Sequence, residues 1–448
     1  MKRVFLFTIT TIIAAVLLAG CSGGGNTANT VTPQAGNATI NTGDAVNDQI
    51  VKFELTVSAV TLTGSGGTSN TGNLLSKPSE VEFVHQAGTF EPLAVVNIPA
   101  GTYLGATLTV SNPEVVVINS GAPTKVPATL TTSTVTVTFS SAIGITSSSS
   151  TVINFDLDLA NSVTLNGNPI SSATVTPKFN VTISSVANQS NEDDDNGEIE
   201  DVHGKVTNIT APNFTIQTDQ SNLTFATDSN TQFTDGITSL SQLKLGGIVE
   251  VDGVTKTDGT KLATKVEMEE ENANAMEVEG ILTAVTGTPA TQITLAHQVD
   301  SDGTSNAPVT VDVAINSNTQ FVVRADKLNL GAPPAFDASH IGKGQRVEAD
   351  TGSSTSTPLV ADKIKLREQA LIGTVAASPA PTSSGFTLTL SPTSAFASLT
   401  GQTSIAVSIV SGTEQRVTPS AGLTVRVRGL IFVNAGTYSM ISTRIDSD

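Results

Sequence analysis

The clearest pattern along the chain is an alternation of apolar and polar residues with a period of two. It runs from Val51 to Val57, slips by one residue, and resumes at Val60. Such alternation is typical of strands with one buried face, and the slip indicates a β-bulge. Similar runs between Gly, Pro, Asn and Ser clusters predict strands at 81–85, 93–98, 103–110, 114–118, 135–139, 152–159 and 179–183. We therefore expect a β-sandwich over residues 49–187.

Beyond an acidic segment at 188–201, four short landmarks recur three times in the same order. They are a strand start that contains Gly, a Ser-Asn-Thr-Gln-Phe segment, a Val-Glu-Val-Asp-Gly segment and a Lys-Val-Glu segment. The copies begin at His203, Ser229, Val249 and Lys265, then at Glu279, Ser317, Val347 and Lys363, then at Ile372, Ser411, Val425 and Arg444. The order predicts three homologous modules. A spacing of about 75 to 95 residues is too long for a solenoid unit, so we expect separate beads on a string.

The modules contain glycine, turn and helix signals that are typical of a small barrel. The Gly inside the first strand permits the sharp bend that closes a barrel, and Asp258-Gly259 predicts a hairpin. Leu240, Leu243 and Leu245 predict a short helical turn before the fourth strand. The predicted fold class is all-β: an N-terminal β-sandwich followed by three tandem OB-like small β-barrels. The expected bounds are 202–270 for module 1, 271–278 for an acidic linker, 279–368 for module 2 and 370–448 for module 3.

The N-terminus has the organisation of an export signal. Met1-Lys2-Arg3 is cationic, residues 4–17 are mostly apolar, and Leu18-Ala19-Gly20-Cys21 follows. The segment is too short for a membrane span with flanks of its own. The Leu-Ala-Gly-Cys ending resembles the lipobox of bacterial lipoproteins. The resemblance implies a signal peptide at 1–20, cleavage before Cys21, and acylation of Cys21 on its thiol and its new amine.

Acylated Cys21 is expected to anchor the protein, because several acyl chains hold a protein on a membrane stably. By the rules of the lipoprotein family, Ser22 in the next position permits transfer to an outer membrane in a cell that has one. Residues 21–48 are rich in Gly, Asn, Thr and Ser and predict a flexible tether. The predicted localisation is export and lipid anchoring to the bacterial cell envelope, at the outer membrane, facing the periplasm or the surface.

Two further parts of the chain resemble uncharacterised families. Residues 98–103, Ile-Pro-Ala-Gly-Thr-Tyr, and residues 156–160, Asp-Leu-Asp-Leu-Ala, resemble a lipoprotein domain family that follows lipoboxes in many bacteria. The modules resemble, over about 250 residues, a family of unknown function that occurs as tandem copies in exported bacterial proteins. The third copy departs from it by replacing the Asp-Gly hairpin and much of the Asn-Thr-Gln-Phe landmark. Neither resemblance implies a chemistry.

The composition disfavours several classes of binding partner. The 448 residues include 40 acidic and 22 basic ones, for a formal charge of -18, which opposes binding to nucleic acid. One Cys excludes disulfide pairs and Cys-based zinc clusters. The absence of Trp and the presence of only two Tyr weaken both base stacking and sugar stacking.

Signatures of catalysis are missing from the sequence. His85, His203, His297 and His340 lie apart, and none has metal-ligand spacing from another. Nucleophile-elbow, phosphate-loop and dinucleotide motifs are also absent. We expect the histidines to be surface or half-buried side chains, no catalytic residues, no resident cofactor, and a protein that is not an enzyme.

Two acidic runs have alternative interpretations. Glu192, Asp194, Asn196 and Gly197 match the first, third, fifth and sixth places of an EF-hand-type calcium loop, but the twelfth place is His203. Calcium binding by Glu192, Asp194 and Asn196 is therefore weighed against a solvated, self-repelling hinge at 188–201. A second run between residues 267 and 279 has the same acidic character without the spacing. For it, too, weak and shared calcium binding is weighed against a solvated, self-repelling linker.

Module 3 is locally basic. Arg426 and Arg428 alternate onto one face of a strand and form a candidate patch for an anionic polymer or an acidic neighbouring module.

The sequence predicts a non-enzymatic, lipid-anchored cell-envelope or surface protein. Its β-modules would mediate binding or structural interactions with envelope or extracellular protein or polysaccharide partners. The alternative is a periplasmic or surface lipoprotein that binds a small ligand or calcium. The sequence leaves the oligomeric state open.

Overall fold

A computed structural model gives the fold of the folded region. It describes residues 35–45, 47–84, 86, 90–147, 150–186, 197–218, 221–270, 277–300, 309–323, 328, 330, 332–352 and 356–447. Residues 34–448 form one compact unit. Among the described residues, no helix has the length and hydropathy needed to span a membrane.

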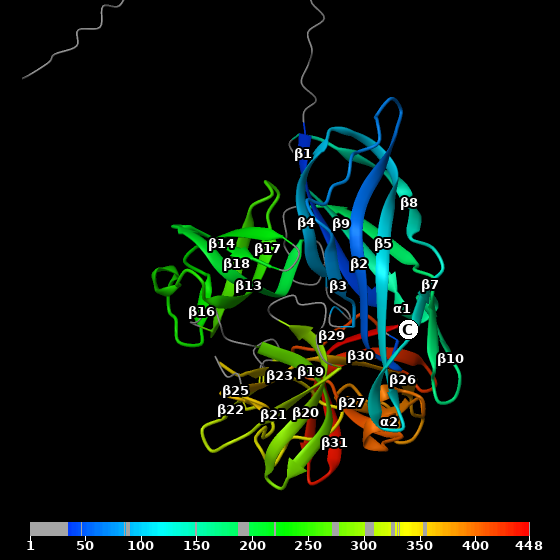
Figure 1. Ribbon diagram of the computed structural model, residues 1–448, viewed down its shortest axis with the longest axis vertical. Coiled ribbons are helices and arrows are strands. Elements are labelled where there is room, and N and C mark those ends of the chain that lie inside the picture. The colour runs from blue at the N-terminus through cyan, green and yellow to red at the C-terminus, as the bar shows by residue number, and fades with distance from the viewer. Residues whose placement is uncertain are drawn as a thin grey trace, which may run out of the picture. The chain divides into compact units, whose positions relative to one another are not determined.

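The first domain is the predicted β-sandwich, drawn in blue to cyan in Figure 1. One sheet has the order β12-β9-β1-β4, and a second has the order β3-β2-β5-β6 with β8 also on β5. Phe53 and Tyr103 from the second sheet share one core with Ile40 and Phe155 from the first. The elements are β1 (Ala35–Ala45), β2 (Ile50–Ser65), β3 (Ser79–Glu82), β4 (Phe90–Pro99), β5 (Gly101–Asn119), β6 (Ala122–Val126), β7 (Ala128–Leu130), β8 (Thr134–Ile145), β9 (Ser150–Asp158), α1 (Leu159–Ser162), β10 (Val163–Asn166), β11 (Ser172–Val175) and β12 (Phe179–Ser185).

The sandwich begins earlier than the sequence pattern indicated. Strand β1 lies inside the segment expected to be a tether, and it pairs with β9 in parallel and with β4 in antiparallel fashion. Ala38 and Ile40 on β1 are almost fully buried. The tether prediction is wrong for residues 35–45, because small residues are enough for a strand held between two others. The predicted bulge is confirmed, since the register of β2 shifts between Val57 and Ala59.

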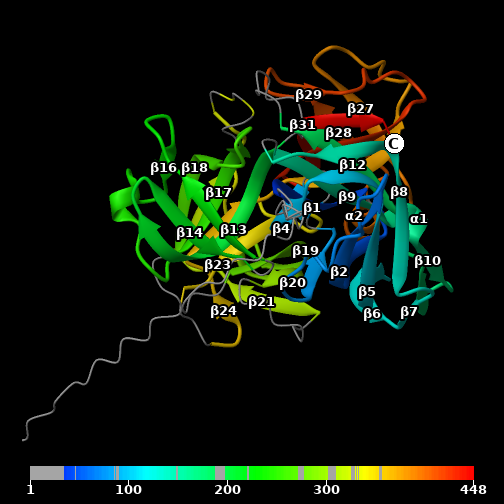
Figure 2. The ribbon, with the colours of Figure 1, turned by 90° about the horizontal axis from the view of Figure 1, so that it is seen from above.

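Module 1 is a closed OB-like barrel. Its strands follow the order β15-β14-β13-β17-β18, and a parallel pairing of β15 with β18 closes the ring, seen in green in Figure 2. The 3-10 helix η1 precedes the fourth strand, β17, as predicted, and Gly259 makes the predicted hairpin turn. The elements are β13 (Glu198–Thr210), β14 (Asn213–Gln217), β15 (Asn222–Ala226), β16 (Gln232–Thr234), η1 (Leu240–Gln242), β17 (Ile248–Thr255) and β18 (Lys261–Glu270).

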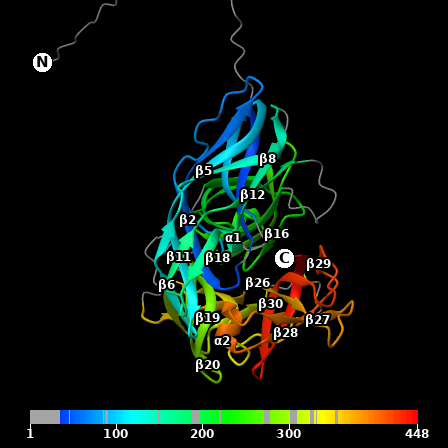
Figure 3. The ribbon, with the colours of Figure 1, turned by 90° about the vertical axis from the view of Figure 1, so that its right-hand side faces the viewer.

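Modules 2 and 3 repeat this topology. In module 2 the ring closes through β21 and β24, and in module 3, drawn in orange to red in Figure 3, through β28 and β31. Module 3 has its helix α2 before the third strand instead of the fourth. Module 2 comprises β19 (Glu277–Gly287), β20 (Ala290–Asp300), β21 (Thr310–Ala314), β22 (Gln320–Val323), β23 (Arg346–Asp350), β24 (Leu359–Val360) and β25 (Lys363–Leu366). Module 3 comprises β26 (Gln369–Val375), β27 (Gly385–Leu390), α2 (Ala395–Thr400), β28 (Ser404–Ser408), β29 (Glu414–Gln415), β30 (Thr424–Asn434) and β31 (Thr437–Ser447).

The glycine of the first strand has the role that its position predicted. A Cβ added to Gly280 would lie 2.0 Å from the backbone oxygen of Ala296, and one added to Gly373 would lie 2.3 Å from that of Thr389. Side chains do not fit at such distances, so glycine lets the first two strands of the barrel approach each other.

The modules are not isolated beads. Leu430 and Phe432 of module 3 belong to the core cluster of module 2, and the Gln345 amide donates a hydrogen bond to the Ile431 carbonyl. The buried Lys261 of module 1 reaches Thr39 in the sandwich. The bead-on-a-string prediction is therefore wrong within the compact unit, because modules share buried contacts.

Candidate functional site

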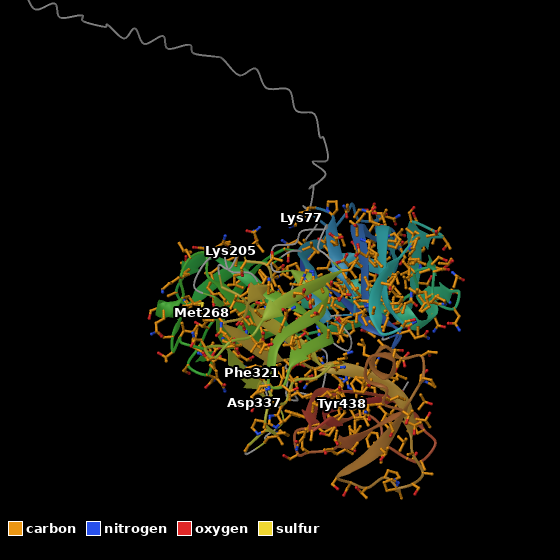
Figure 4. All side chains as sticks on the ribbon, turned by 60° about the horizontal axis from the view of Figure 1, so that its bottom comes forward. Lys77, Lys205, Met268, Phe321, Asp337 and Tyr438 are labelled. Atoms are coloured by element: carbon orange, nitrogen blue, oxygen red, sulfur yellow. The ribbon has the colours of Figure 1, made fainter. Side chains whose placement is uncertain are left out.

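Module 1 presents charged side chains on the outer face of its barrel. Val249, Val251 and Met268 fill the core, so the residues that alternate with them on β17 and β18 point outward. Figure 4 labels Met268 on the ribbon of module 1. Strand register sets Glu250 opposite both His203 on β13 and Glu267 on β18. Both glutamates are at most 5% exposed, so this outer face is covered.

Module 2 presents the equivalent face. Val347 and Ala349 of β23 point into the core, which leaves Arg346, Glu348 and Asp350 outside. On this face Glu279 lies opposite Glu348, and Glu277 lies opposite Asp350. Like charges that lie directly opposite each other repel, so both pairs need cations nearby.

Cations from module 2 connect the two faces. Lys365 Nζ forms an ion pair with Glu269 of module 1 and lies 2.6 Å from Glu348 Oε1. Arg367 Nη1 lies 3.0 Å from Glu250 Oε2 of module 1 and 3.3 Å from Glu348 Oε2. These pairs join the barrels through fully or nearly fully buried charges.

His203 of module 1 adds a further link. Its Nε2 lies 3.2 Å from Glu250 Oε2, and its Nδ1 lies 3.3 Å from Glu277 Oε1 of module 2. Lys363 of module 2 adds another ion pair between the barrels, because its Nζ lies 2.5 Å from Asp235 Oδ2 of module 1. We name the charged boundary of modules 1 and 2 the ionic joint. Its members are His203, Glu250, Lys265, Glu267, Glu269, Glu277, Glu279, Arg346, Glu348, Asp350, Lys363, Lys365 and Arg367.

Negative charge exceeds positive charge in the ionic joint. Seven of its carboxylates are less than a tenth exposed, namely Glu250, Glu267, Glu269, Glu277, Glu279, Glu348 and Asp350. Three of its cations are buried to the same degree, namely Arg346, Lys365 and Arg367. His203, Lys265 and Lys363 are half-buried. Even with His203 protonated, six cations face seven buried carboxylates, and Asp235, which pairs with Lys363, adds an eighth carboxylate.

Protonation equilibria respond to this imbalance. Burial disfavours the imidazolium, but Glu277 and Glu250 outweigh it and hold the pKa of His203 well above its usual value. Burial raises the pKa of Glu348 well above its usual value, and Glu277 and Asp350 add to the rise. Burial also lowers the pKa of Lys365 to about 8. The joint therefore favours bound protons on an imidazole and a carboxyl group.

Two sets of side chains in the joint have the composition of a metal site. His203, Glu250 and Glu348 place one ligand atom each within 4.8 Å of one another. Glu269, Glu277, Glu348 and Asp350 do the same with four carboxylates, all buried. Arg367 already bridges Glu250 and Glu348 in the first set. In the second set the Lys365 ammonium already pairs with Glu269 and Glu348 and lies 3.6 Å from Asp350 Oδ2.

Of the other predicted site residues, Arg426 and Arg428 belong to the part of the chain that the structure describes. Cys21, Glu192, Asp194 and Asn196 lie outside the described residues, so the lipid anchor and the hinge calcium site stay predictions.

Arg426 and Arg428 share a strand face as predicted. Arg428 Nε lies 2.8 Å from Glu368 Oε2, and Arg426 Nη2 lies 3.8 Å from Asp446 Oδ2. The predicted basic patch is thus neutralised within the chain, and we do not propose it as a binding site.

Sequence reasoning missed the ionic joint. It assigned the second acidic run to a solvated linker, but Glu267, Glu269, Glu277 and Glu279 are buried on strands β18 and β19, so that assignment is wrong for them. A usable signal was present in the repeats. Modules 1 and 2 carry opposite charges at equivalent positions, with Glu267 matching Lys365 and Glu269 matching Arg367.

Comparisons with known proteins give two families and no function. Residues 35–177 match a family described as a domain of unknown function, DUF4382, and residues 203–267 match another, DUF5666. A search of curated proteins finds no significant match.

Two solved structures show faint likeness. "Drosophila Unr CSD456" is 13% identical with a TM-score of 0.14, covering 55% of this chain and 97% of the other. A multidomain protein with nucleic acid binding domains from Streptococcus pneumoniae is 12% identical with a TM-score of 0.12, covering 54% and 72%. TM-scores this low have no bearing on function.

Proposed function

We propose that the protein is a non-enzymatic, lipid-anchored protein of the bacterial envelope whose barrels bind uncharged polar surfaces of a protein or polysaccharide. Export and anchoring rest on the sequence of residues 1–21. The joined barrels support a structural or binding role, because they hold their outer surfaces in fixed relation within the compact unit.

The observation that carries the binding proposal is the face formed by the second and third strands of the barrels. OB-like barrels commonly bind polymers on this face. In module 1 it is formed by Asn213, Thr215 and Gln217 on β14 and by Asn222 and Thr224 on β15, all at least partly exposed.

Modules 2 and 3 present the same kind of face. Module 2 contributes Gln292 and Thr294 on β20 together with the exposed Asp312 on β21, which accepts a hydrogen bond from the Thr294 hydroxyl. Module 3 contributes Thr387 and Thr389 on β27 with Ser404 on β28. Hydroxyl and amide groups recognise neutral polar partners by hydrogen bonds. Nucleic acid would instead need cations and stacking aromatics. We therefore propose protein or polysaccharide partners and no nucleic acid.

The test combines location with binding. Intact cells are treated with protease and probed for the folded region, with a Cys21→Ser form that is not lipidated as the control. The purified Cys21→Ser protein is then screened against envelope polysaccharides and proteins. Thr215→Arg with Thr224→Arg blocks the face of module 1, and the exposed Ser241→Arg is the matched control.

We expect Cys21→Ser to abolish membrane retention, and the two face substitutions to abolish a binding signal that Ser241→Arg retains. Retention of Cys21→Ser on the membrane, or partner binding that the face substitutions leave unchanged, would contradict the proposal.

A further inference from the structure

The ionic joint holds an amine and a carboxyl group in contact at a buried boundary. Nζ of Lys365 in module 2 forms an ion pair with Glu269 of module 1, and neither side chain has any exposed surface. Burial takes away the hydration that stabilises both charged forms. Transfer of a proton from the ammonium group to the carboxylate therefore becomes easier, and it leaves a neutral amine beside a neutral carboxylic acid.

The amine of Lys365 has the properties of a nucleophile. Burial lowers its pKa to about 8, so the neutral form, which carries the reactive lone pair, is populated far more than in an exposed lysine. The contact with Glu269 places this lone pair directly beside a carboxyl group. Two groups held in contact react as if each were present at a very high concentration.

Two other lysines each lack one of these requirements. Burial also lowers the pKa of Lys261 to about 8, but the described contact of its Nζ is the Thr39 hydroxyl and not a carboxyl group. Lys363 does contact a carboxyl group, that of Asp235. Burial opposes the charge of Lys363, but Asp235 outweighs burial and raises its pKa, so this side chain stays an ammonium ion. Lys365 combines a neutral amine with a carboxyl group in contact.

Glu348 of module 2 supplies a proton donor at the same point. It is fully buried, and its Oε1 lies 2.6 Å from Lys365 Nζ. Burial and Glu277 hold the pKa of Glu348 well above its usual value, although Arg367, 3.3 Å from Oε2, opposes the rise. A carboxyl group that keeps its proton can give it to a departing oxygen and take another from an attacking nitrogen.

We propose that Lys365 and Glu269 condense to an amide that joins modules 1 and 2 covalently. The neutral Nζ attacks the Cδ carbon of the Glu269 carboxylic acid, a C–N bond forms, and one C–O bond breaks. The Glu348 carboxyl group donates its proton to the departing hydroxyl, which leaves as water, and it recovers a proton from the nitrogen. The step needs no oxidant, reductant or cofactor. The ion pair of Lys365 with Glu269 is the state from which the amide forms.

Glu269 is the preferred carboxyl group among the three around Lys365. The second oxygen of Glu348 is held by Arg367, and Asp350 Oδ2 lies 3.6 Å from Lys365 Nζ. Of the three, Glu269 alone belongs to module 1, so its amide crosses the boundary between the barrels. Such a link restricts the unfolded chain as a disulfide does, in a sequence with one Cys. The proposal goes beyond the envelope-binding function and does not depend on a partner.

The experiment is a peptide map of the full-length Cys21→Ser protein by mass spectrometry. The protein is first denatured completely, which breaks ion pairs and leaves amides intact. Trypsin cuts after Lys and Arg, so Glu269 lies in the peptide of residues 266–324. A modified Lys365 resists trypsin and stays within the peptide of residues 364–367. An amide therefore appears as these two peptides joined, with a mass one water below their sum.

Three variants assign the chemistry. Lys365→Arg keeps a cation in the joint but removes the lysine amine. Lys363→Arg is the matched control, because it changes the neighbouring lysine of the same strand in the same way. Glu348→Gln removes the proton donor and keeps the shape of the side chain.

We expect the joined peptides in the parent and in Lys363→Arg, with fragments that place the bond between Glu269 and Lys365. They should be absent from Lys365→Arg and reduced at least about tenfold in freshly purified Glu348→Gln. The parent map decides the proposal without any variant having to fold. Separate peptides cut after Lys365 in the parent overturn it, as do joined peptides that persist in Lys365→Arg or are undiminished in Glu348→Gln.

Discussion

The two boundaries of module 2, with module 1 and with module 3, join homologous barrels through different kinds of contact. Towards module 1 the contact is made of buried charges, with Arg367 on Glu250 and Lys365 on Glu269. Towards module 3 the buried contact is apolar, with Leu430 and Phe432 packed into the core of module 2, and the Arg428–Glu368 ion pair lies at its edge. An ionic contact depends on pH and bound cations, whereas an apolar contact does not. One fold can therefore provide both a condition-sensitive boundary and an insensitive one.

The equivalent charged face of module 3 shows why sequence similarity alone does not make such a joint. There Arg426 and Arg444 pair with Asp446 of the same barrel, at 3.8 and 2.9 Å. The two arginines are half-buried, and Asp446 is buried. Arg416 of the same barrel pairs with Glu414, and Arg428 pairs with Glu368 at the end of module 2. The excess of carboxylates at the ionic joint is what requires partners from a second barrel.

The largest effect is expected for Lys365→Met. It removes the fully buried cation between Glu269 and Glu348, so the two buried carboxylates lose a shared partner and Glu348 keeps Arg367. Breaking a buried pair in this way costs about 3–5 kcal/mol of unfolding free energy. Chemical denaturation measures the loss, and Lys256→Met, at an exposed position, should change stability by less than about 0.5 kcal/mol.

Phe432→Ala tests the apolar boundary. Truncating this buried ring leaves a cavity between modules 2 and 3 and should cost about 3 kcal/mol. The loss should be the same at acidic and neutral pH, as measured by denaturation at both. A loss that depended strongly on pH would show that the two boundaries do not differ as described.

The unfolding free energy should depend on pH because of the ionic joint. This effect should be smaller than the loss caused by Lys365→Met or by Phe432→Ala. The pKa values of His203 and Glu348 are raised, so the folded chain binds more protons than the unfolded chain above their ordinary values. Stability is therefore expected to fall as the pH rises from about 6 to about 8. His203→Gln should flatten this slope, and Phe432→Ala should keep it. A rise in stability over this range would contradict the assignment.

The smallest change in unfolding free energy is expected at the boundary between module 1 and the sandwich. Lys261 is 4% exposed, its Nζ lies 3.5 Å from Thr39 Oγ1, and burial lowers its pKa to about 8. Replacing this poorly compensated charge in Lys261→Met should stabilise the chain by about 1 kcal/mol at pH 7. The gain should shrink above about pH 8, where the native amine is already neutral. Denaturation of the parent and of Lys261→Met at pH 7 and at pH 9 measures this gain. Destabilisation by Lys261→Met at pH 7 would show that Lys261 is well paired.

Local patterns predicted the fold well. The period-two alternation, the repeated landmarks and the strand glycines at 280 and 373 gave the sandwich and the barrels, because each depends on short stretches of chain. Strand β1 was missed, because Ala38, Ile40 and their small neighbours resemble a tether until β4 and β9 are placed beside them.

The candidate site was hidden for a related reason. Alternation places Glu250, Glu267 and Glu348 on the outside of their barrels, and outside ordinarily means solvent. Burial of that face depends on a second barrel whose contact is non-local. Opposite charges at Glu269 and Arg367, which are equivalent positions, were the available sign.

The most direct test of the ionic joint is a double-mutant cycle on its 3.0 Å pair between modules, Glu250→Gln and Arg367→Met. Unfolding free energies of the parent, the two single variants and the double variant give the coupling. A buried pair between the barrels predicts a coupling of about 2 kcal/mol, with the double variant far less destabilised than the sum of the single ones. Effects that add to within about 0.3 kcal/mol would contradict the account, because two side chains in contact do not act independently.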